Sequence, residues 1–577
     1  MSSNRTSIPD STSHRQLHDE PDKQHSHDPA KSKQLNSKNR QHSHEECDII
    51  GQMIGKYGKY QFFMTFLLSL FQIPNTFHIS SPIYQAADKR FWCKRPADLS
   101  HIDHDVWRNI SQSQDNCHTT NHNWNHVSNT HMLEALVQNT TDRIKCTEWE
   151  FDMADNLGNT WTSEWNLVCD SEYLKNVAEM FFLVGVATGG IISGYLSDRF
   201  GRRTMLFWSV IFQTIFGFVL YIPLSFRVHL ALRGLLGLVS VSVTYAGLIL
   251  AIEFVDGKWR TIAGMYNLFP LPVSYMLISG IAYLTQDYRL LQLCIAIPGI
   301  FLCFLWFVIP ESPRWLLCKG RTAEVATIIR KVCEVNKREC PPNVEKLLKP
   351  PPSNSETDDG CISLFGNSYL RLITICFPCI WFTMNLVYYG LILNMNSFGG
   401  NVYLNSALAG LVEIPAIALA IFVIMFVGKK WILFSTMFCA GIACFIACII
   451  TFFGEHPSSE WLKITFLMLG KFTISAGNTV MPVYTAELYP TAIRNAGVGA
   501  CNVAAGVALI IVPYLSLLNK IQSYFLMALV ASSSILGSLV VIFLPESMPH
   551  DAAKRTSNAS QHSGDEHHEE RAYVFSA

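Results

Sequence analysis

Long apolar runs alternate with short polar segments from residue 61 to residue 544. The hydrocarbon core of a bilayer is about 30 Å thick, a helix of roughly 20 apolar residues crosses it, and irregular backbone in lipid is costly. Each run is therefore expected to form a spanning helix. The twelve expected spans are Gln61–Ile83, Tyr173–Leu196, Thr204–Leu224, Val228–Ala251, Ile262–Leu284, Leu290–Ile309, Leu370–Leu393, Val402–Val427, Trp431–Phe453, Trp461–Thr485, Ile493–Leu518 and Ile521–Leu544.

Basic residues gather in every second loop between these runs. Cytosolic loops are enriched in lysine and arginine, so this asymmetry predicts the orientation. An even number of spans then places both termini in the cytosol, and we expect the plasma membrane as the location. The basic residues in question are Arg199, Arg202, Arg203, Lys258, Arg260, Arg314, Lys319, Arg321, Lys429, Lys430 and Arg494.

Composition agrees with a membrane protein and excludes some partners. Of the 577 residues 49% are hydrophobic and 15% charged, and the formal net charge is -1. A soluble domain has roughly 25% charged residues. The near-zero net charge gives no electrostatic footprint for nucleic acid. Residues 1–50 and 548–577 are polar and lack apolar runs, so we expect disordered cytosolic tails.

The loop after the first span, residues 84–172, is far longer than the others. It contains an even number of cysteines, which in an oxidising compartment predicts two disulfides, with three pairings open. Asn109-Ile-Ser and Asn139-Thr-Thr are acceptable glycosylation sites, which agrees with exposure outside the cell. The four cysteines are Cys93, Cys117, Cys146 and Cys169.

Two landmarks recur in the chain at nearly one spacing. Glu253-x6-Arg260 is repeated by Glu487-x6-Arg494, and Pro310-Glu-Ser by Pro545-Glu-Ser. The repeat predicts a six-helix bundle over residues 51–320, a cytosolic linker over 321–368 and a second bundle over 369–547. Halves related in this way enclose a site near the midplane and rock around it.

The stretch Gly194-Tyr-Leu-Ser-Asp-Arg-Phe-Gly-Arg-Arg203 resembles the signature of the major facilitator superfamily. Ile309-Pro-Glu-Ser-Pro-Arg-Trp315, Glu487-Leu-Tyr-Pro-Thr-Ala-Ile-Arg494 and Ile73-Pro-Asn-Thr-Phe-His78 narrow the resemblance to the organic cation, anion and carnitine transporter family. The resemblance covers about residues 51–547. It implies an all-α major-facilitator fold and a transporter without cofactors.

Charged residues mark the cytosolic helix ends. Opposite charges there can pair across helices in one state and separate in another, which biases a two-state equilibrium by about 1 to 3 kcal/mol. The alternative is that they only anchor helix ends at the interface. The candidate gating residues are Asp198, Arg199, Arg202, Arg203, Glu253, Arg260, Glu311, Arg314, Glu487 and Arg494.

Ionisable residues inside spans are costly and usually line a path for solute or ions. Glu413, Lys471 and Glu179 lie within apolar runs. Tyrosine rings hold cationic amines by cation–π attraction. The candidate substrate-binding residues are Glu413, Tyr388, Tyr389, Tyr245, Asn267, Lys471 and Gly506, with Asn385 as a further polar group. Plain packing is the alternative for each tyrosine, and a structural hydrogen bond for Glu413.

The resemblance also bears on the solute. At the place of Gly506, resembling cation carriers have an aspartate and anion or carnitine carriers an arginine. Ile417 likewise replaces a lysine of the anion branch. We therefore expect a small organic cation or zwitterion carried by alternating access. An organic anion carrier and a transport-inactive receptor or scaffold are the alternatives, while a co-transported ion and the oligomeric state stay open.

Other chemistry is poorly supported by the sequence. His118, His122 and His126 have helical zinc-binding spacing, and the tail has His25, His27, His42 and His44, but polar segments of this kind are more often simply solvated. Gly257-Lys258 lacks the upstream glycine of a phosphate-binding loop. No set of nucleophile, base and orienting residue is recognisable, so we expect neither a metal site nor an enzyme.

Overall fold

The fold was examined in a computed structural model of the chain. It describes residues 49–55, 57–95, 99, 103, 105–107, 116–120, 143–152, 158–341, 344–348, 365, 368–453, 457–489 and 494–546. Apart from Ile49 and Ile50, which begin a helix, the expected disordered tails lie outside these residues, as do both glycosylation sites, Asn109 and Asn139.

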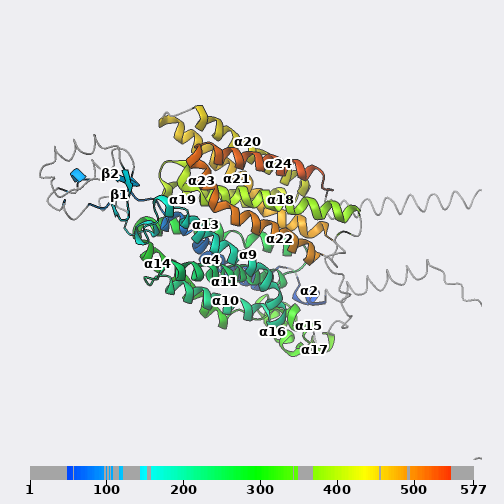
Figure 1. Cartoon of the computed structure of the whole chain (residues 1–577). Helices are drawn as coiled ribbons and strands as arrows, with labels where there is room; N and C mark the ends of the chain where they lie inside the picture. The colour runs from blue at the N-terminus through cyan, green and yellow to red at the C-terminus, as the bar shows by residue number, and fades with distance from the viewer. Residues whose placement is uncertain are drawn as a thin grey trace, which may run out of the picture. The chain divides into compact units, whose positions relative to one another are not determined.

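The N-terminal bundle is formed by helices that pack along the membrane-spanning direction (Figure 1). Helices α9, α10 and α11 pack side by side, and α4 packs against α11, α13 and α14. The elements are α2 (Ile49–Ile54), α3 (Lys59–Ser69), α4 (Gln72–Ser80), α5 (Pro82–Gln85), α9 (Leu174–Phe200), α10 (Arg202–Val219), α11 (Phe226–Glu253), α12 (Lys258–Tyr266), α13 (Pro270–Thr285), α14 (Tyr288–Cys303) and the 3-10 turn η4 (Phe304–Phe307).

The C-terminal bundle repeats this arrangement. Helix α20 packs against α21 and α24, and α18 packs against α22 and α24. The elements are α18 (Ser368–Leu393), η6 (Met395–Phe398), α19 (Val402–Val423), α20 (Lys429–Phe453), α21 (Pro457–Leu488), α22 (Arg494–Ile511), η7 (Val512–Tyr514), α23 (Leu515–Ile521) and α24 (Phe525–Ile542).

Proline explains why several expected spans consist of more than one helix. The first span is divided into α3, α4 and α5, and α5 begins at Pro82. The fifth is divided before Pro270, and the eleventh becomes a 3-10 turn around Pro513. A proline inside a helix removes a backbone hydrogen bond and clashes with the preceding turn. Despite these interruptions, each of the three runs remains long and apolar enough to cross a membrane.

Ten helical segments within the described residues are long and apolar enough to cross a membrane. The other two expected spans correspond to α10 and α21, which are helical but contain more polar residues. Helix α10 begins with Arg202 and Arg203, and α21 contains Lys471 and Asn478. The twelve-helix pattern expected from the apolar runs is therefore confirmed, with these two spans the least apolar.

The long loop between α5 and α9, here called the cysteine loop, contains two small antiparallel sheets. Strand β1 (Phe91–Cys93) pairs with β4 (Trp149–Phe151), and β2 (His118–Thr120) with β3 (Arg143–Lys145). Disulfides join Cys93 to Cys146 and Cys117 to Cys169. The structure thus selects one of the three pairings that the sequence left open. The base of the loop contains α8 (Trp161–Glu164) and the 3-10 turn η3 (Cys169–Ser171).

The end of the N-terminal bundle opposite the cysteine loop is covered by short helices. They are α15 (Pro313–Cys318), α16 (Thr322–Val335) and α17 (Val344–Leu347). Helix α16 buries Val325, Ile329 and Val332 in the same core as residues of α2 and α3. Asn336 follows α16, and its side chain accepts from the Tyr60 backbone amide at 3.0 Å. Part of the expected linker is therefore packed onto the N-terminal bundle.

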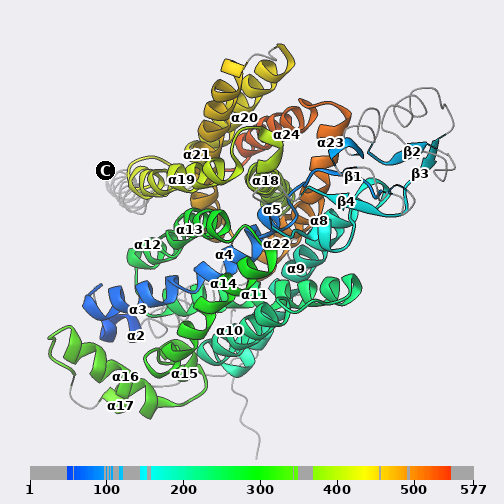
Figure 2. The ribbon, with the colours of Figure 1, turned by 90° about the vertical axis from the view of Figure 1, so that its left-hand side faces the viewer.

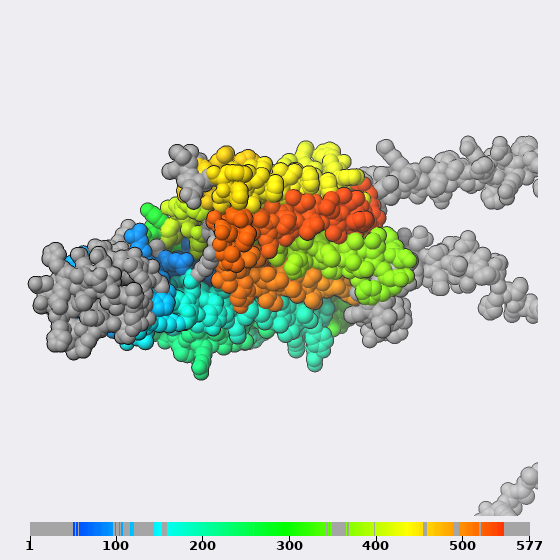
Figure 3. Space-filling model, turned by 45° about the horizontal axis from the view of Figure 1, so that its top comes forward, coloured from blue at the N-terminus to red at the C-terminus, as the bar shows by residue number. Residues whose placement is uncertain are grey.

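The two bundles meet along two helix pairs. Helix α13 packs against α19, and α9 packs against α22. Figure 2 shows the C-terminal helices on one side of these contacts and the N-terminal helices on the other. In Figure 3 the two bundles lie against each other along their length. Close backbone approach occurs at Gly410 of α19, where an added Cβ would lie 2.6 Å from the Pro272 carbonyl oxygen. Residues from α13, α18, α19 and α21 are consequently brought near one another.

Candidate functional site

A buried ion pair lies inside the C-terminal bundle, close to the contact with α13. The ammonium of Lys471 on α21 lies 3.0 Å from Oε2 of Glu413 on α19, at an angle that does not suit a hydrogen bond. The Tyr388 hydroxyl on α18 donates to Oε1 of Glu413 at 2.7 Å. Glu413 is 3% exposed and Lys471 2%. Charges this deeply buried are stable only when paired and hydrogen-bonded.

Aromatic rings surround the Lys471 ammonium. Its nitrogen lies 3.4 Å from the centroid of the Tyr388 ring and 5.8 Å from that of Tyr275. Tyr389 meets Tyr388 edge to face, with centroids 5.0 Å apart. The arrangement combines a carboxylate with the faces of aromatic rings, which is the chemistry that binds an ammonium group. We call Glu413, Lys471, Tyr388, Tyr389 and Tyr275 the ammonium cluster.

Three of the predicted substrate-binding residues lie outside this cluster. Tyr245 on α11 lies beside Gly190 of α9. Asn267, 1% exposed, accepts from the Gln72 side-chain amide at 2.7 Å within the N-terminal bundle. Gly506 lies at the contact between α22 and α9, where an added Cβ would lie 2.9 Å from Cβ of Ala187. Tyr245 and Asn267 thus lie in the N-terminal bundle, and Gly506 lies at the contact between the bundles.

Some of the predicted gating residues of the N-terminal bundle form ion pairs between helices. Arg202 lies 2.7 Å from Asp198 and 3.3 Å from Glu253, so it joins the ends of α9, α10 and α11. Arg202 and Glu253 are mostly buried, whereas the Asp198 side chain is 71% exposed. The Arg202–Glu253 contact is therefore the better shielded of the two from solvent and salt.

Glu311 caps the turn between α9 and α10. Its Oε1 accepts from the backbone amides of Arg203 at 2.9 Å and Ser312 at 3.0 Å. Gly201 in this turn has a φ of 101°, and an added Cβ would lie 2.4 Å from Oε2 of Glu311, so glycine is required by both conformation and space. The Arg203 side chain donates to the Trp306 carbonyl at 2.6 Å.

Asp256 is an acceptor that the sequence analysis missed. Its carboxylate lies 3.2 Å from Arg314 and 3.4 Å from Arg260, so it joins α12 to α15. Glu253, which shares a motif with Arg260, contacts Arg202 instead. The side chain of Arg199 instead lies over the Phe200 ring, at 5.5 Å.

The corresponding end of the C-terminal bundle has its own ion pair. Lys429 at the start of α20 lies 2.6 Å from Glu487 at the end of α21. An added Cβ at Gly428 would lie 1.8 Å from Oε1 of Glu546, which parallels the contact of Gly201 with Glu311. The Arg494 side chain lies outside the described residues. All the ion pairs described at this end join elements of one bundle.

Near the cysteine loop, by contrast, side chains cross from one bundle to the other. Tyr403 of α19 stacks on Tyr84 of α5 with centroids 5.6 Å apart, and meets Tyr283 of α13 at 5.7 Å. The Asn396 amide donates to the Ile83 carbonyl at 2.9 Å. This tyrosine layer holds the two bundles together at the end where the cysteine loop lies.

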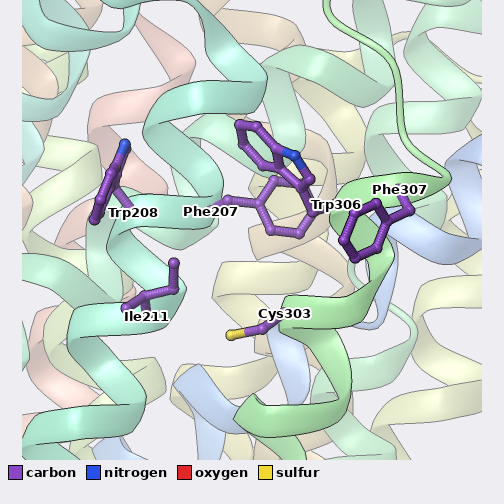
Figure 4. A pocket seen from close by; sticks show the side chains of 6 residues that line it. All are labelled: Phe207, Trp208, Ile211, Cys303, Trp306 and Phe307. Carbon is purple, nitrogen blue, oxygen red and sulfur yellow. The ribbon is translucent and has the colours of Figure 1, made fainter.

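An apolar pocket of about 310 Å³ lies between α10 and α14, away from the ammonium cluster. Figure 4 shows side chains of Phe207, Trp208, Ile211, Cys303, Trp306 and Phe307 around it. Trp208 and Phe307 are 55% and 83% exposed. An outward-facing apolar surface on spanning helices faces lipid, so this pocket is unsuited to a charged solute.

Sequence reasoning also missed Tyr275, because its place beside Lys471 depends on how α13 of one bundle packs against α19 of the other. Of the histidines with zinc-like spacing, His118 lies in strand β2, and His122 and His126 lie outside the described residues. Within the part of the chain that the structure describes, no group of three or more histidine, cysteine or acidic side chains is placed to hold a metal ion.

Comparison with known proteins places this geometry in a family. The family "Sugar (and other) transporter" matches residues 108–552. The chain is 30% identical to the organic cation transporter protein of Drosophila melanogaster, over 87% of this chain and 92% of that protein. It is also 30% identical to human organic cation/carnitine transporter 2, with the same coverage, and 31% identical to mouse solute carrier family 22 member 4, again with the same coverage.

Solved structures agree on the fold. The xylose transporter XylE from E. coli, in a partially occluded inward-open conformation, matches with a TM-score of 0.58 at 15% identity, over 85% of this chain and 98% of that chain. Another structure of the same transporter, described as a proton:xylose symporter of the major facilitator superfamily, gives 0.57. The chain is thus a multi-pass membrane protein of the sugar (and other) transporter family, not an enzyme, and it belongs with the organic cation and carnitine transporters of solute carrier family 22.

Proposed function

We propose that this protein carries small organic cations or zwitterions, such as quaternary amines or carnitine-like solutes, across the plasma membrane by alternating access. The observation that carries the proposal is the ammonium cluster. Its buried Glu413 carboxylate and Tyr388 ring already hold an ammonium, that of Lys471. The names of the relatives, organic cation and carnitine transporters, support the same class of solute.

A solute ammonium has the same requirements as the Lys471 side chain. A carboxylate supplies the opposite charge, and each aromatic face adds about 0.5 to 2 kcal/mol of cation–π attraction. The solute therefore competes with Lys471 for Glu413 and Tyr388. Because Tyr275 comes from α13 of the other bundle, movement of the bundles changes the cluster.

A zwitterion can interact with both Glu413 and Lys471. When its ammonium takes the place of the Lys471 ammonium, Lys471 is released and pairs with the solute carboxylate. Both buried charges then keep an opposite partner, which avoids the large cost of one unpaired charge in a dry site. A simple anion satisfies only Lys471 and leaves Glu413 without its cation. The cluster thus favours cations and zwitterions over anions.

For alternating access we propose that the two ends of the bundles have different roles. The tyrosine layer around Tyr403 closes the end near the cysteine loop, which we place outside the cell. The ion pairs around Arg202 and Lys429 brace each bundle at the other end, where both termini are placed in the cytosol. Bundles that stay internally rigid move as units around a central site.

The test compares uptake of tetraethylammonium, carnitine and an aromatic carboxylate by proteoliposomes that contain wild-type protein or Glu413→Gln. Uptake of the cation and the zwitterion is expected to fall by about tenfold or more, because roughly 1.4 kcal/mol of lost recognition is a factor of ten. Glu345→Gln is the matched control, because that glutamate is 54% exposed and pairs with Arg330 far from the cluster.

Uptake of only the aromatic carboxylate, unchanged in Glu413→Gln, would contradict the proposed solute class. Saturable binding of a cation by the purified protein without accumulation in sealed vesicles would instead identify a receptor. Circular dichroism and size-exclusion profiles of each variant establish that the loss concerns recognition and not folding.

A further inference from the structure

The N-terminal bundle buries an acidic and a basic residue of its own, and neither belongs to the ammonium cluster. Arg233 on α11 is fully buried, and its Nε and Nη2 have no hydrogen-bond partner among the described residues. Glu179 on α9 is half-buried, and its Oε1 is likewise buried and unpartnered among them. Ionisable groups in spanning helices are costly and usually serve ions or solutes.

Glu179 is the repeat counterpart of Glu413, and Arg233 lies one helical turn before Gly237, the position equivalent to Lys471. Glu179 precedes Glu413 by the same number of positions as Glu253 precedes Glu487. Glu179 and Glu413 lie on the second spanning helix of their bundles, and Arg233 and Lys471 lie on the fourth. Each bundle therefore carries one acid and one base on the same pair of helices.

The two pairs differ in whether the charges meet. Glu413 and Lys471 are 3.0 Å apart, whereas no contact within 4.0 Å joins the charged atoms of Glu179 and Arg233 in the described structure. The guanidinium of Arg233 is held elsewhere. Its Nη1 donates to the His78 carbonyl at 3.3 Å, and its central carbon lies 4.6 Å from the Phe182 ring and 5.3 Å from the Trp161 ring.

We call Glu179 and Arg233 the open pair and Glu413 and Lys471 the closed pair. The open pair has the chemistry of a proton site. A buried carboxylate with an unpartnered oxygen is most easily stabilised by taking up a proton. Two imidazole nitrogens around Arg233 are also buried and unpartnered among the described residues. They are Nδ1 of His78, whose carbonyl accepts from Arg233, and Nε2 of His229, one turn before Arg233 on α11.

Among the other titratable groups, Lys175 of α9 and Tyr514 of η7 are already engaged. Lys175, one turn before Glu179, lies 2.5 Å from Asp88, and the Tyr514 hydroxyl of η7 contacts the Met180 sulfur at 3.1 Å. Those packed around the arginine are His78 of α4 and His229 of α11, and Trp161 of α8 supplies an aromatic face. Glu179 is the acidic group of this set, and α9 borders the C-terminal bundle through α22.

We propose that Glu179, compensated by Arg233, is a proton-binding site that makes transport depend on external pH. When Glu179 is ionised it neutralises Arg233. When it is protonated, the buried guanidinium becomes an uncompensated positive charge beside the contact between the bundles, and it opposes entry of a cationic solute. External acid therefore slows cation uptake, a conclusion that rests on the proposed transport of cations.

The first experiment measures initial tetraethylammonium uptake by proteoliposomes at external pH values from about 5 to 8, a range in which buried carboxyl groups and histidines titrate. Wild-type uptake is expected to fall several-fold toward acid. Glu179→Gln, which imitates the protonated state, is expected to be slow at every pH and to show no pH dependence. Glu345→Gln is the control and should follow the wild type.

Wild-type pH dependence in Glu179→Gln overturns the proposal, as does pH-independent wild-type uptake. A pH dependence that persists in Glu179→Gln but disappears in His78→Gln or His229→Gln assigns the proton to an imidazole and also overturns it.

A second experiment needs no transport. Infrared difference spectra of the purified wild-type protein between the two ends of that pH range should contain a protonated-carboxyl band that Glu179→Gln lacks and Glu345→Gln retains. If the band is present but no solute is accumulated, the proton site stands and the proposed transport fails. If solute is accumulated but the band is the same in Glu179→Gln, the transport stands and the proton site fails.

Discussion

The two bundles each bury an acid on their second spanning helix and a base on their fourth, but with different results. In the C-terminal bundle Glu413, Lys471 and Tyr388 form a closed cluster. In the N-terminal bundle Glu179 and Arg233 stay apart, and the arginine is held by a backbone carbonyl and aromatic rings. We propose that one repeat binds the ammonium group of the solute and that the other binds a proton.

The difference follows from the side chains around each base. A lysine ammonium is a point charge that a single carboxylate and one ring face satisfy, whereas a guanidinium is planar and stacks on aromatic rings. Phe182 and Trp161 lie beside Arg233, whereas Glu413 and Tyr388 lie beside Lys471. The two acids occupy equivalent positions of the repeat, and the two bases lie one helical turn out of register in different surroundings.

The largest effect is expected from breaking the closed pair. Lys471→Ala leaves the Glu413 carboxylate buried without its cation, and removing one partner of a buried pair costs about 3 to 5 kcal/mol. The thermal unfolding temperature of the purified protein should fall clearly. The double variant Glu413→Gln/Lys471→Met should recover most of this loss and still not transport. Normal uptake by the double variant would mean that Glu413 and Lys471 have only a structural role.

A smaller effect is expected from making the open pair resemble the closed one. Arg233→Lys removes the bond to the His78 carbonyl and the stacking on Phe182, a loss of about 1 to 2 kcal/mol. The unfolding midpoint should fall less than in Lys471→Ala. If the two variants are equally destabilised, the proposed contrast between the bundles is wrong.

At the helix ends that we propose to face the cytosol, Glu253→Gln should lower the maximal rate of uptake by about fivefold and leave the apparent affinity nearly unchanged, because it biases the balance of states by about 1 kcal/mol. Asp198→Asn should act less, since that carboxylate is 71% exposed and screened by solvent. Kinetic measurements normalised to reconstituted protein test this order. A larger effect of Asp198→Asn than of Glu253→Gln would contradict the greater role given to Glu253.

The smallest effect is expected at a surface pair outside both bundles. Arg330→Gln removes the partner of Glu345, and both side chains are more than half exposed. Pairs of this kind contribute about 0 to 1 kcal/mol. Uptake and unfolding temperature should match the wild type within error, and a clear change in either would indicate that α16 and α17 influence the bundles.

The sequence predicted the fold well because apolar runs and basic loops are direct consequences of the bilayer. It predicted Glu413 and Lys471 as site residues because a charge in an apolar run is conspicuous. It did not predict Tyr275, which reaches the cluster only through the packing of α13 on α19, or Asp256, which lies in a loop already rich in charge. The pairing of the four loop cysteines was also beyond reach, because it depends on how two small sheets place them.

Gly506 has a consequence for engineering this protein. Its hydrogen atom allows α22 to touch Ala187 of α9, and any added carbon would overlap that methyl group. The aspartate or arginine that resembling carriers have at this place would wedge the helices apart here. A charge introduced at residue 506 would therefore change how often the bundles come together before it changed which solute they prefer.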